Sequence, residues 1–317
     1  MLTNITLHDE GEYTVDFGKV SSKTTVIVQG ELDILHRKQM AQELYRNWVR
    51  GALALKYLKR GLEDFSDKAV KKQHKYLIER LGNICNTCTD ESLLPHKPDK
   101  CPCQNKQQCF CYLRKKQKPR QMCPNGGFCG KMCDRIVCNH RFRTPLFTNT
   151  DVQRWSSDPW IVATCFINTP GYKGKQSAKE VDCSGLLSLC INSMFIEMML
   201  GKVIIDGKRD AFAQAREARN DILHNPNYEL SDGKLNKCIK MFKEVLEIKD
   251  KNGNTPLKKE PGVEKALLLL DKVQRNQIEI NLEHEVKELR EHGMSSLEDK
   301  YQTAKQQANF ITYAFEF

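Results

Sequence analysis

A short run of polar side chains near the end of an amphipathic segment has the residue types needed for proton transfer and phosphate binding. Arg219, Asn220 and His224 follow apolar side chains at helical spacing, and Pro226 ends the helix because it disfavours helical geometry at Asn225. A neutral imidazole can accept a proton near neutral pH, and a guanidinium can bind a phosphate and stabilise negative charge. The amide of Asn220 can orient the imidazole or donate a hydrogen bond to an oxyanion.

The same three residues also have an ordinary structural interpretation. Arg219 can be a solvated surface residue, and His224 can stabilise the carboxyl end of the helix, where a cation suits the helix dipole. Asn220 and His224 are separated by about 40° around the helix axis, whereas Arg219 and His224 are separated by about 140°. A target shared by Arg219 and His224 must therefore lie between them, or a second copy of the chain must complete the arrangement.

The pattern of apolar residues places this segment in a mainly α-helical protein with a short N-terminal β-hairpin. Residues 1–34 are extended, with strands predicted at 12–17 and 24–28. Helices are expected where apolar side chains recur at helical spacing, namely over residues 35–65, 67–81, 181–200, 209–225, 234–247 and 263–317, with a short helix starting at Asp158-Pro159.

These elements predict a helical body made of residues 35–82 and 144–248, interrupted by an insertion at 83–143. Residues 249–262 are rich in Pro, Gly and Asn, which predicts a linker to the C-terminal helical region at 263–317. The apolar spacing of that region alternates between three and four, as in a bundle or coiled-coil seam, so its helices offer a surface for a protein partner.

The insertion is rich in cysteine, and its spacing predicts structural zinc binding. Zinc prefers four tetrahedral thiolate or imidazole ligands, usually in close pairs. Cys85-x-x-Cys88, Cys129-x3-Cys133 and Cys138-x-His140 are candidate pairs, and the other candidate ligands are Cys101, Cys103, Cys109, Cys111 and Cys123. How these ligands pair is left open by the spacing, as is an insertion with inert thiols. Cys183 and Cys190 lie in the most apolar segment and are expected to be small core residues.

The insertion also carries the excess of positive charge. Residues 96–143 contain 12 basic and two acidic side chains, which accounts for the whole formal net charge of +10. A local excess of this kind favours a polyanion, usually nucleic acid. The strongest candidates for contacts with RNA are Arg114, Lys115, Lys116, Lys118, Arg120, Arg141 and Arg143, among which aromatic side chains are interleaved.

Composition narrows the cellular setting. No apolar run in the 317 residues reaches the roughly 18 that a membrane span requires, and Met1–Glu10 lack a basic segment followed by an apolar one. We therefore expect no membrane contact and a cytoplasmic or nuclear location. In that setting the 14 cysteines are expected to bind metal or pack in the core rather than form disulfides.

The motif and its flanking segments resemble a known superfamily. Arg219-Asn220-x-x-x-His224, between an Ala-rich helix and Asn225-Pro226, resembles the Arg-(4 to 6)-His motif of the HEPN superfamily. The flanking segments, in order, are similar to an uncharacterised animal family named for an X-chromosome open reading frame, and more remotely to the HEPN domain of DAZ-interacting ubiquitin-ligase proteins. The segments that carry the likeness are Tyr45–Trp48, Leu53–Leu58, Gly61–Phe65, Trp155, Asp158–Trp160 and Cys183–Asn192, within residues 40–80 and 155–248.

This resemblance implies a HEPN-like helical bundle and a metal-independent endoribonuclease that acts as a homodimer. On that mechanism the ribose 2′-hydroxyl attacks the phosphate, His224 acts as general base or acid, Arg219 holds the scissile phosphate and Asn220 positions one of them. Other members of the superfamily are RNA-binding or adaptor domains. The alternatives are therefore a non-catalytic module with structural zinc that binds RNA or a protein partner, and an interaction protein of innate immunity.

Overall fold

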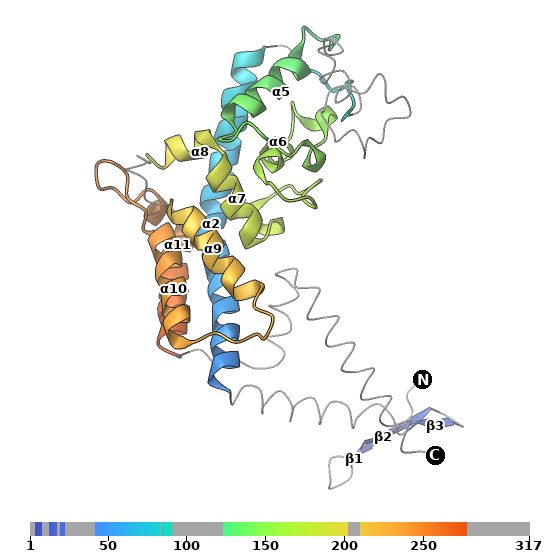
Figure 1. Cartoon of the computed structure of the whole chain (residues 1–317). Helices are drawn as coiled ribbons and strands as arrows, with labels where there is room; N and C mark the ends of the chain where they lie inside the picture. Colours follow the sequence, from blue (N-terminus) through green and yellow to red (C-terminus); the bar gives the residue numbers. More distant parts are fainter. Residues whose placement is uncertain are drawn as a thin grey trace. The chain divides into compact units, whose positions relative to one another are not determined.

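The computed structural model of this protein describes residues 4–7, 13–17, 20–22, 42–82, 84–90, 123–201 and 210–277. The chain divides into two compact units. The first comprises residues 1–53, 222–235 and 277–317, and the second comprises residues 54–221 and 236–276. The described residues are mainly helical, as the sequence predicts (Figure 1).

The elements follow one another along the chain with short connections. The strands are β1 (Asn4–Leu7), β2 (Tyr13–Phe17) and β3 (Val20–Ser22). The helices are α2 (Glu43–Leu81), α5 (Phe128–Asn139), α6 (Pro159–Ala163), α7 (Cys183–Asn192), α8 (Met194–Met199), α9 (Ala211–Leu223), α10 (Asp232–Leu246) and α11 (Pro261–Gln274). Short 3-10 turns cover Phe147–Asn149, Val152–Arg154, Thr164–Phe166, Ala178–Glu180 and Leu257–Lys259.

The three strands form an antiparallel sheet in the order β1-β2-β3. Ile5 pairs with Val15, and Val15 pairs on its other side with Ser22. The observed pairing differs from the predicted hairpin, because β2 pairs with the segments directly before and after it. The second strand predicted from the sequence, at residues 24–28, lies outside the described residues.

The long helix α2 is continuous over 39 residues, whereas the sequence predicts two helices and a bend at Gly61. No proline interrupts it, and buried side chains such as Leu62 and Phe65 continue at helical spacing across the predicted break. Gly61 instead permits close packing, because a Cβ there would lie 2.7 Å from a methyl carbon of Leu246 and 3.1 Å from the Cβ of Ala266. The ends of α10 and the middle of α11 therefore pack closely against α2 (Figure 1).

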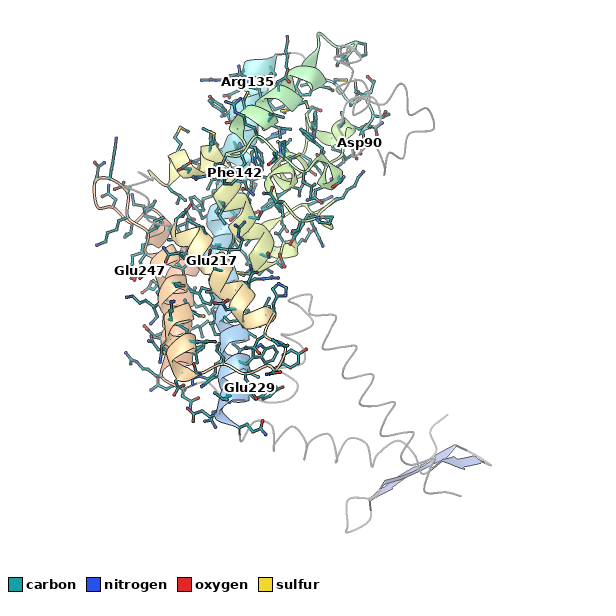
Figure 2. All side chains as sticks on the ribbon, viewed as in Figure 1. Asp90, Arg135, Phe142, Glu217, Glu229 and Glu247 are labelled. Carbon is teal, nitrogen blue, oxygen red and sulfur yellow. The ribbon has the colours of Figure 1, made fainter. Side chains whose placement is uncertain are left out.

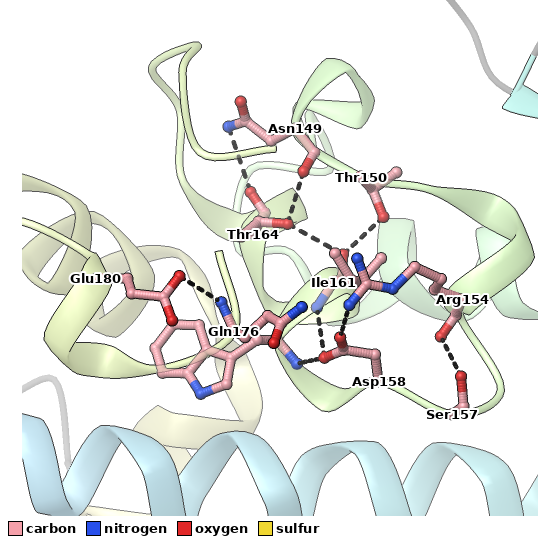
Figure 3. A network of polar contacts seen from close by, with 10 residues as sticks. Asn149, Thr150, Arg154, Ser157, Asp158, Ile161, Thr164, Gln176 and Glu180 are labelled. Carbon is pink, nitrogen blue, oxygen red and sulfur yellow. Dashed lines mark hydrogen bonds and ion pairs between the residues drawn. The ribbon is translucent and has the colours of Figure 1, made fainter. Parts of the chain in front are cut away.

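The predicted helix start at Asp158-Pro159 is confirmed. An Asp158 carboxylate oxygen accepts hydrogen bonds from the amides of Trp160 at 3.0 Å and Ile161 at 3.4 Å, and Pro159 occupies the first turn. The helix is short because a polar network takes over after Ala163. As Figure 3 shows, the hydroxyl of Thr164 donates to the carbonyls of Asn149 and Ile161, which fold residues 149–164 into a compact turn.

The strongly apolar segment at 181–200 forms two helices, not the single one predicted. Asp182 caps α7 through the amide of Gly185 at 2.8 Å, and all but one residue of α7 is buried. The chain then becomes extended at Ser193, whose hydroxyl accepts from the amide of Ile196 and so starts α8. Ser193 also forms an isolated antiparallel bridge with His140, so tertiary pairing ends α7 at that position. Cys183 and Cys190 are buried in this region, which confirms their predicted place in the core.

The segment predicted as a linker, residues 249–262, packs against the second unit. The Asp250 carboxylate accepts hydrogen bonds from the amides of Asn252 and Asn254, which closes a tight loop. Leu257 is fully buried, and Lys68 of α2 forms an ion pair with Glu260 at 2.6 Å. Turn-forming residues thus mark a sharp loop here, because one buried leucine holds it to the helices.

Candidate functional site

Four cysteine side chains converge at the end of α2. The sulfur atoms of Cys85, Cys88, Cys123 and Cys129 all lie within 4.8 Å of one another. The sulfurs of Cys85 and Cys88 are 3.7 Å apart, and all four residues are free thiols rather than disulfides. The sequence predicted all four as metal ligands, but the spacing did not show that they form one group.

Tight turns bring these cysteines together. Gly82 has a φ of 74°, which lets the chain reverse directly after α2 and enter the segment that carries Cys85 and Cys88. Before α5, the amide of Gly127 donates to the carbonyl of Cys123 at 3.2 Å, and Gly126 and Gly127 both have positive φ. This turn places Cys129 in the first turn of α5, one helix-start away from Cys123.

The donor set and its dimensions fit a tetrahedral metal ion. With Zn–S distances of about 2.3 Å, the edge of a tetrahedron is about 3.8 Å, close to the observed Cys85–Cys88 separation. Burial raises the pKa of Cys85, but hydrogen bonds from Thr87 and from backbone amides together lower it to about 6. Burial and the neighbouring sulfurs raise the pKa of Cys88 to about 12. One thiolate is thus favoured without a cation, and a divalent ion would favour ionisation of the others.

The remaining predicted ligands are distributed differently. Cys133 is buried and Cys138 is exposed, both on α5 and both outside the four-cysteine group. Cys133 lies one turn beyond Cys129, a rise of about 6 Å, so it is displaced along the helix from the group. The predicted pair Cys129-x3-Cys133 is therefore corrected to a pairing of Cys129 with the other three. Four further candidates lie outside the described residues, namely Cys101, Cys103, Cys109 and Cys111.

His140 was predicted as a metal ligand, and the structure gives it a different role. It is fully buried and stacks on Phe166 with 5.8 Å between ring centroids. Its Nδ1 accepts from the backbone amides of Phe142 at 3.2 Å and Thr144 at 3.4 Å, and its Nε2 lies 3.2 Å from Oδ1 of Asn168. Both ring nitrogens are thus engaged, and a neutral imidazole with the proton on Nε2 satisfies all three contacts.

This burial predicts a pH dependence of stability. Burial lowers the pKa of His140 from its ordinary value of 6.5, against the effect of Asn168. Below about pH 6.5 the unfolded chain therefore binds a proton that the folded protein rejects, so the free energy of unfolding should decrease with pH until the folded pKa is reached. Urea unfolding between about pH 7.5 and pH 5 should show this slope. The slope should be shallower in His140→Gln and unchanged in His224→Gln, and equal slopes in all three proteins would contradict the assignment.

The predicted polar trio lies at the end of α9 and just beyond it. Asp210 caps the start of this helix by accepting from the amide of Phe212 at 3.0 Å, and the last helical residue is Leu223. Arg219 is half-buried and its Nη1 donates to Oδ1 of Asn220 at 3.2 Å. Asn220 and His224 are exposed, and Figure 2 shows the neighbouring Glu217 on α9 and Glu229 in the segment after it.

The charge of Arg219 acts on the start of α7. Burial and then the Asp182 carboxylate raise the pKa of the Tyr172 hydroxyl and of the Cys183 thiol, and the positive charge of Arg219 opposes both shifts. The Tyr172 hydroxyl donates to Asp182 at 2.6 Å. The guanidinium therefore has an internal electrostatic environment in addition to its contact with Asn220.

A family model described as a domain of unknown function (DUF4559) matches residues 39–315, which is most of the chain. The protein belongs to the DUF4559 family. A curated relative is the mouse (Mus musculus) "Uncharacterized protein CXorf38 homolog", which is 26% identical over 213 residues. That alignment covers 64% of this chain and 58% of the mouse protein, so less than two thirds of the relative is matched. This likeness confirms the predicted relation to an X-chromosome open-reading-frame family. No solved structure matches the chain.

The basic residues predicted to contact RNA are only partly placed in the DUF4559 protein. Arg143 is exposed. Arg141 is held internally, because its Nε donates to the carbonyl of Ile191 at 2.8 Å and its Nη2 pairs with Glu197 at 2.9 Å. Arg141 is therefore better explained as a link between the end of α5 and α8. The other five lie outside the described residues, namely Arg114, Lys115, Lys116, Lys118 and Arg120.

Two features of the DUF4559 protein were missed from the sequence. Asp90, labelled in Figure 2, follows the first two cysteines and accepts from the amide of Val152 at 2.9 Å and from Lys173 at 2.8 Å. A lone aspartate in a polar segment gives no signal of these distant partners. Tyr228 is half-buried beside Trp48 near His224, and nothing in the spacing indicates that contact.

The helices of the DUF4559 protein were also compared with the requirements of a membrane span. Over the part of the chain that the structure describes, no helix is both long enough and apolar enough to cross a bilayer.

Proposed function

We propose that this DUF4559 protein is a HEPN-type RNA-processing protein that acts as a metal-independent endoribonuclease in a homodimer. The observation that carries the proposal is the exposed His224 directly after α9, preceded on the same helix by an exposed Asn220 and by Arg219. An exposed imidazole is accessible to a polymeric substrate, and a neighbouring guanidinium suits its phosphate.

The reaction follows from the chemistry of these groups. His224 removes the proton from a ribose 2′-hydroxyl, whose oxygen attacks the adjacent phosphorus. The bond from phosphorus to the 5′-oxygen breaks, and that oxygen receives a proton from a protonated imidazole, which the partner copy supplies. Arg219 stabilises the charge on the phosphoryl oxygens and Asn220 orients the guanidinium through the contact described above. The products are a 2′,3′-cyclic phosphate and a free 5′-hydroxyl.

The four-cysteine group is proposed to bind a structural zinc ion. Four thiolates in tetrahedral array are the donor set that zinc prefers, and they leave no ligand position for substrate. Residues Cys85, Cys88, Cys123 and Cys129 would hold the ion, which would join the end of α2 to the start of α5. Cleavage itself uses no metal in this proposal.

The test is RNA cleavage by the full-length protein with excess EDTA, which removes Mg²⁺ from solution. Single-stranded RNA should be cut, and the new ends should be 2′,3′-cyclic phosphates that resist ligation until they are hydrolysed. Absence of cleavage, or 3′-hydroxyl ends, would refute the enzymatic proposal.

A second candidate is a non-catalytic HEPN-type module that binds RNA or a protein partner. The effect of Arg219 on Tyr172 and Cys183 favours it, because a guanidinium stabilised by the carboxylate of Asp182 serves the fold. In that case wild type would bind RNA without cleaving it, and His224→Ala would bind equally well. Neutralising Arg114, Lys115, Lys116, Lys118 and Arg120 would then weaken RNA binding and make it less dependent on salt.

A further inference from the structure

An aromatic cluster lies beside the segment that carries His224. Trp48 of α2 is fully buried, and its ring is in contact with Tyr228 at 4.8 Å between centroids in an edge-to-face arrangement, and with Tyr45 at 5.9 Å. Both tyrosines are half-buried, so part of each ring remains in solvent. All of these residues belong to the first compact unit.

The cluster is fixed to the end of α9. The indole nitrogen of Trp48 donates to the carbonyl of Ile222 at 2.7 Å, which satisfies an otherwise unpaired carbonyl in the last turn of the helix. Ile222 is two residues before His224. The amide of Leu230 donates to the carbonyl of Leu44 at 2.9 Å, so both ends of the segment that contains His224 and Tyr228 are held to α2.

Asn225 fixes the conformation of the same segment. Its Oδ1 accepts from the amides of Asn227 at 3.1 Å and Glu229 at 3.4 Å, and its Nδ2 donates to the carbonyl of Glu229. This turn holds Tyr228 in the left-handed region with a φ of 54°, which is uncommon for a bulky side chain. The backbone thus keeps a tyrosine ring next to Trp48 at a conformational cost that glycine or asparagine would avoid.

We propose that Tyr228, supported by Trp48 and flanked by Tyr45, stacks on a base of single-stranded RNA next to the bond that is cleaved. This inference rests on the proposed function and assigns its substrate class as unpaired RNA. A partly exposed aromatic ring with a buried aromatic support suits stacking on any base. His224 precedes Tyr228 by four residues in a segment fixed at both ends, so a base on Tyr228 brings its own phosphodiester to the imidazole. Duplex RNA, whose bases are already stacked, would bind less well.

The experiment uses full-length protein and a 2′-O-methylated oligonucleotide, which lacks the attacking hydroxyl and cannot be cleaved. Binding is compared with that of an abasic oligomer of the same charge and length. Wild type should prefer the base-bearing oligomer, and Tyr228→Asn should lose this preference, with base-dependent affinity reduced roughly 5- to 100-fold. Asparagine tolerates left-handed geometry, so this variant removes the ring without adding strain. Tyr228→Phe should bind like wild type.

The matched control is Tyr76→Ala, which removes a half-buried tyrosine that packs on Phe195 in the other unit. It should keep the preference for bases. Equal binding of base-bearing and abasic oligomers by wild type would overturn base stacking, even if the protein cleaves RNA. A preference that survives in Tyr228→Asn would also overturn it. A preference lost only in Tyr228→Asn, in a protein that does not cleave, would support stacking and refute the nuclease.

Discussion

Replacing His224 with alanine is expected to lower the rate of RNA cleavage by about 100- to 10,000-fold, because positioned acid–base groups contribute factors of this size. The affinity for an uncleavable 2′-O-methylated oligonucleotide should change little, since His224 is exposed and its loss does not disturb the core. The measurement is the single-turnover cleavage rate in EDTA, together with the thermal unfolding temperature of each variant.

Glu229→Gln is the control, because Glu229 is exposed in the same segment and contributes backbone atoms, not its carboxylate, to the turn around Asn225. It should cleave at the wild-type rate. The homodimer predicts one further result: a mixture of Arg219→Ala and His224→Ala proteins should regain activity that neither has alone if the two copies share a site. Equal cleavage rates in wild type and His224→Ala would exclude His224 as the acid–base group.

Loss of the metal is expected to have the largest effect on stability. Structural zinc contributes about 10 kcal/mol or more to folding of small zinc-binding peptides at neutral pH. In Cys129→Ser, or after removal of the ion with a strong chelator, we expect loss of one bound zinc per chain and a lower unfolding temperature. Proteolysis should begin in the segment that contains Ile84 and at the start of α5, since these regions depend on the cluster.

Cys138→Ser is the matched control, because Cys138 is exposed on the same helix and lies outside the four-cysteine group. It should retain the ion and the wild-type unfolding temperature. Metal analysis gives the decisive measurement. A wild-type protein purified without metal, and equally stable with and without added zinc, would contradict the assignment.

The sequence predicted elements whose signals are local. Asp158-Pro159 starts a helix because capping requires only adjacent residues. The sequence did not predict the break at Ser193, because pairing with His140 from another part of the chain causes it. Gly61 was interpreted as a bend, although close packing against Leu246 explains it. Local propensity therefore located the helices well and located their interruptions poorly.

The candidate sites show the same division. Residue type identified cysteines as ligands, but Cys123 joins Cys85 and Cys88 only after a long excursion of the chain, so spacing did not define the set. His140 has the side chain of a ligand, and burial gives it three internal partners instead. The polar trio at the end of α9 was recognised from order along one helix, whereas the contact of Tyr228 with Trp48 requires the folded chain.

The closeness of Cys88 and Cys123 has a consequence for how the chain can vary. Because their sulfurs lie within 4.8 Å, residues 89–122 leave and rejoin the body at nearly one point. The entropy of closing such a loop changes only slowly with its length. A protein in which residues 92–121 are replaced by a short Gly-Ser bridge, keeping Asp90 and Cys123, should therefore retain its helices and its ion. Such an excision would convert the most basic part of the chain into an interchangeable cassette, so that tolerance to insertion and affinity for polyanions can be engineered separately.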